Sequence, residues 1–189
     1  MNGALTRFVT TAGLVLGSLG ACSGSGSGVS VSSEDYAVQY DYDEFRAAAD
    51  GRDFPVLIAG NPFPDLAADE VSRRLLPVMQ ANRPRPRLTF TPGQRSSYRL
   101  VLVFDPASDV TAAKACKGDT RTGTHVAGRI AMFAVYCRGD LPMSQAVGRT
   151  TATRPEDPSM GQLFRDVFQT VFTDAQINQP NQGYPGGLR

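Results

Sequence analysis

Apolar positions along the chain follow two spacings, one typical of strands and the other of helices. Residues 54–60 form a continuous apolar run that ends in glycine, which predicts a strand covered on both faces. Residues 129–137 have the strongest strand pattern, so we expect this strand near the centre of a sheet. Strands at 88–91 and 97–104 flank turn residues at 92–95, which predicts a hairpin. The other predicted strands cover residues 36–42 and 145–152.

Three segments have helical spacing. The first is short and covers residues 43–50. The second begins at Asp65, a residue type that caps helix N-termini, and extends to about Gln80. Pro77 lies inside this segment and predicts a kink or a break, because proline lacks a backbone donor. The third begins at Asp157 and carries an apolar stripe with three phenylalanines, which indicates a core helix.

The order of these elements predicts an α+β fold. We expect a single domain with a mostly antiparallel sheet of about four to six strands and two main helices on one face. One face of the strand at 145–152 carries only small side chains, so a helix or a ligand can approach its backbone closely. The strand at 36–42 has a row of tyrosines of one parity, which can bind carbohydrate or pack on the sheet, and we expect packing.

The first 22 residues have the layout of an export signal. Arg7 precedes an apolar run at residues 8–19 that is too short to cross a bilayer, which needs about 20 apolar residues. The run ends in Leu19-Gly20-Ala21-Cys22, which resembles the lipobox of bacterial lipoproteins. The resemblance implies cleavage before Cys22, lipidation of this cysteine and a membrane anchor. In Gram-negative bacteria, Ser23 implies the periplasmic face of the outer membrane. The alternative is an ordinary signal in which Cys22 is incidental.

The chain then divides into four parts. We expect residues 1–21 to be the signal peptide, 22–33 a lipidated Gly/Ser tether, 34–175 the domain and 176–189 a disordered tail. The chain has 19 Lys and Arg residues and 18 Asp and Glu residues, and the signal contains one of the basic residues. Because a balanced charge produces no field that attracts nucleic acid, we expect no nucleic-acid partner.

Cysteine usage agrees with export. Apart from Cys22, the chain contains Cys116 and Cys137, and an oxidising compartment favours a disulfide between them. Two free thiols are the alternative. Their spacing is unlike the Cys-x-x-Cys of redox-active pairs, so we interpret the bridge as structural.

Charge is distributed unevenly along the chain. Residues 34–70 contain ten acids and two arginines, whereas residues 71–100 contain seven arginines and no acid. The basic segment can form a cationic patch for an acidic partner, or the two segments can neutralise each other in the fold. Prolines keep Arg83, Arg85 and Arg87 extended, so these three are candidate partner-binding residues.

A second candidate contact follows the apolar strand at 54–60. Asn61 and Phe63 lie in a proline-rich turn ahead of a helix N-terminus, the place where open sheets often bind ligands. Either candidate can instead be a rigid connector.

The residues that could take part in catalysis form no recognisable catalytic motif. His125 is the only histidine, so it has no histidine partner for a metal, and a serine triad would have to use it. Prolines replace the backbone donors that a phosphate loop needs after the apolar strand. We therefore expect no catalytic residues, no metal, no cofactor and no enzymatic activity.

The element order also resembles, at fold level, the periplasmic lipoproteins that activate penicillin-binding proteins and the amino-terminal domain of TolB-like proteins. The resemblance implies a non-catalytic accessory or binding module for an envelope protein assembly. Two alternatives stay open: a receptor for a small ligand or glycan fragment, and a hydrolase.

Overall fold

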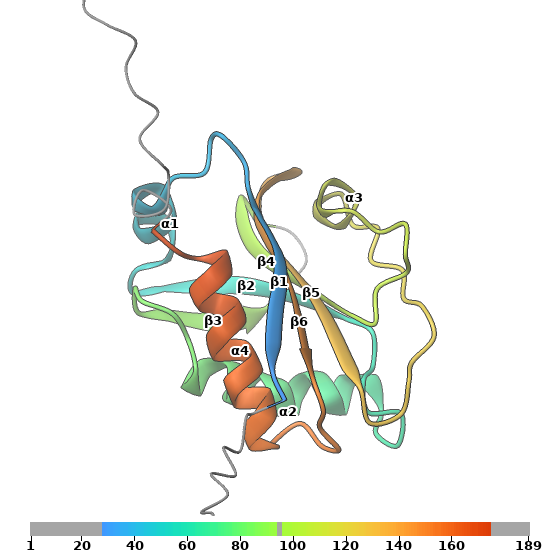
Figure 1. The fold of residues 1–189 in the computed structure, drawn as a ribbon. Helices are drawn as coiled ribbons and strands as arrows, with labels where there is room; N and C mark the ends of the chain where they lie inside the picture. Colours follow the sequence, from blue (N-terminus) through green and yellow to red (C-terminus); the bar gives the residue numbers. More distant parts are fainter. Residues whose placement is uncertain (1–27, 94–95, 175–189) are drawn as a thin grey trace, which may run out of the picture.

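A computed structural model describes residues 28–93 and 96–174. These residues form one six-stranded mixed sheet in the order β1-β6-β5-β4-β2-β3, together with four helices (Figure 1). The strands are β1 (Ser30–Tyr36), β2 (Arg52–Ala59), β3 (Leu88–Pro92), β4 (Tyr98–Phe104), β5 (Ile130–Arg138) and β6 (Leu141–Thr150). The helices are α1 (Tyr42–Ala49), α2 (Ala68–Ala81), α3 (Ala112–Cys116) and α4 (Pro158–Val171). The fold is α+β, as the sequence predicts.

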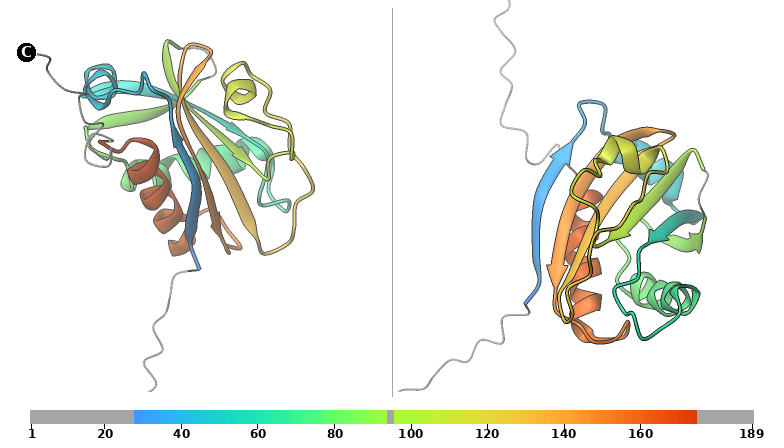
Figure 2. Two further views of the ribbon diagram at one scale, coloured as in Figure 1. Left: turned by 45° about the horizontal axis from the view of Figure 1, so that its top comes forward. Right: turned by 90° about the vertical axis from the view of Figure 1, so that its right-hand side faces the viewer.

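The main core lies between one face of the sheet and the helices α1, α2 and α4. The stripes predicted for the two long helices point into it: Val71, Leu75 and Met79 of α2 are buried, as are Leu163 and Phe168 of α4. The two main helices therefore pack on one face, as predicted. In Figure 2 the sheet separates α4 from α3.

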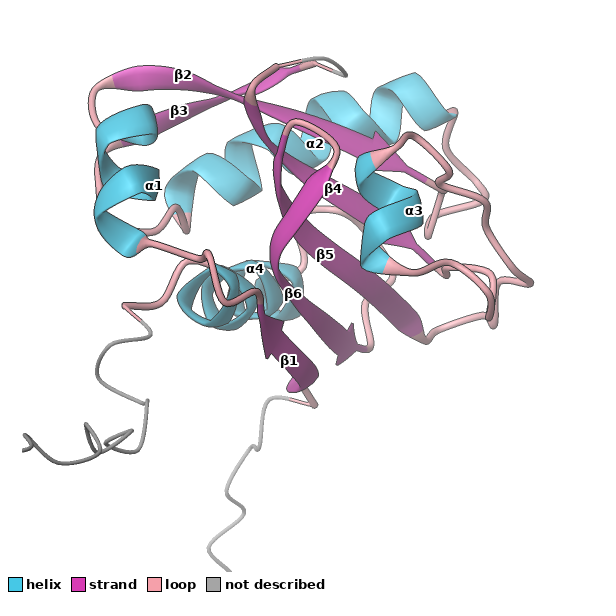
Figure 3. Ribbon diagram, turned by 90° about the horizontal axis from the view of Figure 1, so that it is seen from above, coloured by secondary structure: helices cyan, strands magenta, loops and turns pink. Residues whose placement is uncertain are grey.

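A second, smaller core covers the opposite face, where α3 packs (Figure 3). The predicted disulfide is present and joins Cys116 of α3 to Cys137 of β5, with the two Cα atoms 5.7 Å apart. Arg99, which is 7% exposed, donates hydrogen bonds to the carbonyls of Ser96 and Cys116 beside this bridge. Each face of the sheet thus has its own core, and both cores are built around one sheet.

The hairpin predicted from residues 88–91 and 97–104 is wrong. β3 and β4 lie on opposite sides of β2 and pair with it in parallel, so β3 borders Arg52–Val56 and β4 borders Val56–Ala59. Pro92 and Gly93 instead lie where the chain leaves β3 on one side of β2 and crosses toward β4 on the other side. A Cβ atom on Gly93 would lie 3.0 Å from the Pro55 Cβ atom, so glycine permits this close passage.

The N-terminal boundary also differs from the prediction. β1 begins at Ser30, inside the predicted tether. The strand predicted at 36–42 is wrong beyond Tyr36, because β1 ends there and α1 begins at Tyr42. β1 is an edge strand, and its half-buried Val31 packs against the main core. The tyrosines pack, as expected: the hydroxyls of Tyr36 and Tyr40 donate hydrogen bonds to carbonyls at the end of α4.

The remaining differences concern α2. Its N-cap is Ala67 rather than Asp65, and the helix runs through the exposed Pro77 without the predicted break. No helix in the described part of the chain is long and apolar enough to cross a membrane. The predicted signal peptide, Cys22 and the predicted tail at 176–189 lie outside the described residues.

Candidate functional site

The loop after β2 builds the fold and offers little surface for a partner. The Asn61 side chain accepts a hydrogen bond from the Phe63 backbone (2.9 Å) and donates one to the Leu66 carbonyl (2.8 Å), which closes the turn. Phe63 is 4% exposed and packs in the main core. The Phe63 ring therefore has little exposed surface with which to contact a partner, because its burial stabilises the fold.

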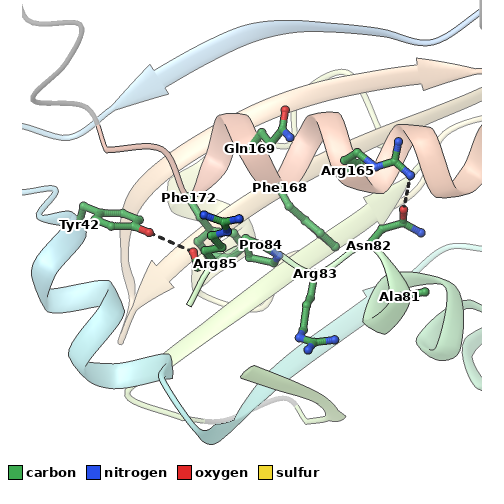
Figure 4. Close-up of a pocket in the computed structure, with 10 residues that line it drawn as sticks. All are labelled: Tyr42, Ala81, Asn82, Arg83, Pro84, Arg85, Arg165, Phe168, Gln169 and Phe172. Carbon is green, nitrogen blue, oxygen red and sulfur yellow. Dashed lines mark hydrogen bonds between the residues drawn. The ribbon is translucent and has the colours of Figure 1, made fainter. Parts of the chain in front are cut away.

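The arginine segment borders a cavity of about 520 Å³ between α1, the end of α2 and the second half of α4 (Figure 4). Arg83 and Arg85 come from the predicted segment, whereas Arg87 is not among the lining residues. The full lining consists of Tyr42, Ala81, Asn82, Arg83, Pro84, Arg85, Arg165, Phe168, Gln169 and Phe172. We call this cavity the arginine pocket.

Asn82 positions one wall of the arginine pocket. Its Nδ2 atom donates a hydrogen bond to the Val78 carbonyl (2.8 Å) and thereby fixes Asn82 at the end of α2. Its Oδ1 atom accepts a hydrogen bond from Arg165 (2.9 Å), and a second bond joins Arg165 to Gln162 (2.9 Å). Both acceptors are neutral amide oxygens, so these bonds do not neutralise the Arg165 guanidinium charge.

The extended arginine segment is held by its backbone. The Tyr42 hydroxyl donates a hydrogen bond to the Arg85 carbonyl (3.1 Å), and the Gly51 backbone donates one to the Arg87 carbonyl (2.5 Å). Gln80 bridges the end of α2 to the start of β3 through bonds to Leu88 and Phe90 (both 2.8 Å). The arginine side chains therefore extend from a fixed backbone.

Aromatic rings form the floor of the arginine pocket. Phe172 stacks on Phe45 with ring centroids 4.3 Å apart, and Phe168 contacts Phe90 at 5.1 Å. Figure 4 shows Arg83, Arg85 and Arg165 arranged around Phe168. Phe168 is fully buried and Phe172 is 3% exposed, so these packed rings support the pocket from beneath while the arginines form its cationic rim.

The charge of this rim is not neutralised by the described part of the chain. No acidic residue lines the pocket, and Arg83, Arg85 and Arg165 form no salt bridge with a described carboxylate. By contrast, Arg73 pairs with Glu70 at 2.5 Å, and Arg74 pairs with Glu156 at 2.5 Å. Among the described arginines of residues 71–100, Arg73 alone pairs with an acid from residues 34–70. Pairing between the acidic and basic segments therefore does not neutralise the arginines of the pocket rim.

Sequence reasoning missed the residues that α4 contributes. Arg165, Phe168, Gln169 and Phe172 are spaced three, four and seven residues apart, so they share one face of a helix. This spacing in the sequence could have indicated that the four side chains lie together. What the sequence could not show is that the end of α2 packs beside this face.

The small face of β6 holds a helix and not a ligand. A Cβ atom on Gly148 would lie 2.6 Å from both the Leu163 Cδ1 and the Val167 Cγ2 atoms of α4, so no space is left between the helix and the strand. Ala146, on the same face, is fully buried. A receptor site on this face is therefore excluded.

His125 forms a dyad with a carboxylate. Its Nδ1 atom lies 2.7 Å from Asp105 Oδ2, and both side chains are largely buried. Among the described residues, no serine hydroxyl is hydrogen-bonded to His125, and no group of three potential ligands gathers for a metal ion. The dyad borders a second cavity of about 600 Å³, which Asp105 lines.

Neither a model of a known protein family nor a curated protein sequence matches the chain. The chain is similar in structure to the PelC dodecamer from Paraburkholderia phytofirmans, seen in two crystal structures, one of a single-residue variant. The sequence identities are 10% and 13%. Each match has a TM-score of 0.40 and covers 76% of this chain and 96% of the PelC chain. This degree of similarity assigns no family.

Proposed function

We propose that the chain is a membrane-anchored periplasmic lipoprotein that acts as a non-catalytic binding module for an envelope protein assembly. The lipobox ending in Cys22 supports the anchor. The observation that carries the binding role is the arginine pocket, with three guanidinium groups that lack carboxylate partners around a phenylalanine floor. Ser23 favours the periplasmic face of the outer membrane in a Gram-negative host.

The pocket chemistry favours an acidic segment of a partner protein. Guanidinium groups bind carboxylates through two parallel hydrogen bonds, so the arginines of the rim are suited to acidic side chains. α1 and the end of α4 lie away from the start of β1 in Figure 1. A tether that enters at Ser30 therefore begins away from the arginine pocket.

Crosslinking in intact cells tests the binding role. The variant Arg83→Glu with Arg85→Glu reverses two charges on exposed side chains, and Arg52→Glu is the matched control on an exposed site outside the pocket. We expect the unmodified protein and the control to recover the same envelope partner and the double variant to lose it. Equal recovery by the double variant, or no specific partner for the unmodified protein, would contradict the proposal.

Mass spectrometry of the mature N-terminus tests the anchor separately. We expect a chain that begins at a lipid-modified Cys22, and Cys22→Ala should release the protein from the membrane fraction. An unmodified N-terminus or an uncleaved chain would show that Cys22 is incidental.

A receptor for an acidic small ligand or glycan fragment is a second candidate. The cavity of about 520 Å³ favours it, because small-molecule pockets commonly span about 300–1,000 Å³. Calorimetry with uronic-acid oligosaccharides separates the two functions: binding that the double variant abolishes, without a protein partner in cells, would favour the receptor. For the hydrolase alternative, no hydrogen bond joins His125 to a serine hydroxyl among the described residues.

A further inference from the structure

The second cavity lies at the end of the domain where the chain enters from the predicted anchor. It opens on the sheet face opposite α4, and its lining includes Gly28 and Ser30 at the start of β1. Gly28 is six residues after Cys22, a distance that an extended chain spans in about 20 Å at most. Lipidation of Cys22 would therefore hold this cavity close to the membrane surface.

The strand register explains why a hollow exists here. Ser30 of β1, Arg149 of β6 and Ala131 of β5 lie side by side in one row across three strands. The small Ala131 side chain leaves space between Arg149 and the loop that carries Asp105 and His125. The hollow is thus built by the sheet and closed by a loop from elsewhere in the sequence.

Arg129 and Arg149 line the cavity, and neither forms a salt bridge with a described carboxylate. Arg149 donates a hydrogen bond to the Ser32 hydroxyl (3.2 Å), and Arg129 forms no salt bridge with any described residue. Thr124 and Thr151 also line the cavity. Guanidinium and hydroxyl groups are donors that bind a phosphate group.

The one acidic residue in the lining does not neutralise these arginines. The Asp105 Oδ2 atom is bonded to His125 (2.7 Å), and its Oδ1 atom accepts a hydrogen bond from the Ala131 backbone (3.3 Å). Both carboxylate oxygens therefore have partners within the protein, and Asp105 forms no ion pair with Arg129 or Arg149.

An apolar side chain at the rim indicates the source of that anion. Val126 lines the cavity and is 54% exposed, the most exposed large apolar side chain after Val38 among the described residues. Free phosphate gains nothing from an exposed valine, whereas an apolar side chain can enter the interfacial layer of a membrane beside a headgroup.

From these features we propose that the cavity between Arg129 and Arg149 binds the phosphate of an anionic lipid headgroup and thereby seats this end of the domain on the membrane. The choice of a lipid over free phosphate rests on the membrane anchor of the proposed function. The phosphate chemistry rests on the cavity alone.

The experiment uses the chain from Ser23 onward, which contains the whole described domain and lacks Cys22, so that no lipid anchor contributes. Sedimentation with vesicles of phosphatidylcholine containing 30% phosphatidylglycerol is one arm, and vesicles of pure phosphatidylcholine are the reference. Titration with inorganic phosphate, followed through the Thr124 and Ala131 amide signals in NMR spectra, is the other arm.

We expect binding to the anionic vesicles that Arg149→Gln and Arg129→Gln each weaken at least tenfold. Arg52→Gln is the matched control, since it removes one charge outside the cavity, and it should change binding less than twofold. Thermal melting of each variant shows that it is folded. An equal loss with Arg52→Gln would indicate nonspecific attraction and overturn the proposal.

The other outcomes separate the two parts of the inference. If phosphate shifts the amide signals but the protein does not bind vesicles, the site binds phosphate and the lipid proposal is wrong. If phosphate causes no shifts and vesicles do not bind, the phosphate site itself is wrong. The variant Arg83→Glu with Arg85→Glu should lose its partner in cells. Its loss of vesicle binding should be no larger than expected from its change in charge, which the Arg52→Glu control calibrates. Failure of the arginine pocket and failure of this cavity are therefore distinguishable.

Discussion

Leu163 of α4 lies so close to Gly148 of β6 that a Cβ atom on Gly148 would be 2.6 Å from the Leu163 Cδ1 atom. Val167 Cγ2 lies at the same distance from that position. The helix therefore rests directly on the strand backbone, and this contact fixes the depth at which α4, with its arginine-pocket residues, sits on the sheet.

Substitution Gly148→Ala should destabilise the domain by about 2 kcal/mol, because one added methyl group forces α4 away from the sheet. The measurement is urea unfolding at neutral pH. Gly123→Ala is the control, since its added Cβ atom would have its nearest contact at 3.5 Å, an ordinary van der Waals distance. Similar stabilities for the two variants would mean that α4 does not pack as described.

The bridge between Cys116 and Cys137 should contribute roughly 3 kcal/mol to stability, because it closes a loop with a sequence separation of 21. We expect Cys116→Ala with Cys137→Ala to lower the melting temperature under oxidising conditions. A strong reductant should then lower the melting temperature of the unmodified protein and leave that of the double variant unchanged. Peptide mapping that finds free thiols at these positions would refute the bridge.

Glu44 links α1 to the sheet and should make stability depend on pH. Its carboxylate accepts hydrogen bonds from the Tyr98 hydroxyl (2.6 Å) and from Arg138 (2.7 and 2.9 Å). The Tyr98 bond first, and Arg138 second, hold the pKa of Glu44 below its usual value. A lowered pKa means that the contribution is complete above the unfolded value of about 4.3 and is lost as pH falls through the lower folded value.

The variant Glu44→Gln should therefore lose about 1 kcal/mol of stability at pH 7, a modest figure because the contact is partly exposed. Near pH 3 the difference from the unmodified protein should shrink. Urea unfolding at both pH values checks this, with Glu34→Gln on the exposed β1 strand as the control. A difference that is the same at both pH values would show that charge is not the cause.

Asp105 has an unusual backbone that its side chain compensates. Its φ angle is 47°, in the left-handed region that disfavours most residues but that asparagine and aspartate tolerate. We expect Asp105→Ala to cost about 2 kcal/mol and Asp105→Asn about 1 kcal/mol, since asparagine keeps both the tolerance and an oxygen for the Ala131 amide. Thermal and urea unfolding of both variants measure the difference, and equal losses would argue against backbone strain.

Local patterns in the sequence predict the elements that depend on local packing. The stripe of α4 and the apolar run of β5 each lead to the right structure, because burial of one side of an element leaves a periodic signature. The disulfide also follows from the cysteine count together with the expectation of export. Strand order does not: Pro92 and Gly93 look like a hairpin turn, and their true role in crossing β2 depends on a contact with Pro55 that no local pattern encodes.

In the candidate sites too, features set by local sequence could be predicted and features set by contacts between distant segments could not. Arg83 and Arg85 could be predicted because prolines keep their segment extended, whereas Arg165 joins them only through the packing of α4 against the end of α2. The burial of Phe63 could not be predicted, because a position in a loop does not reveal that an apolar side chain turns back into the core. Asp105 and His125, twenty residues apart, meet only once the loop closes on β5.

The pairing of β1 with β6 bears on the timing of folding. Ser30 pairs with Arg149, so the first strand to emerge finds its partner only after most of the domain has followed. Contacts of such high sequence separation form late, because a long loop must close first. A chain exported N-terminus first would thus keep its leading strand unpaired, and its edge incomplete, until nearly the whole domain had crossed the membrane.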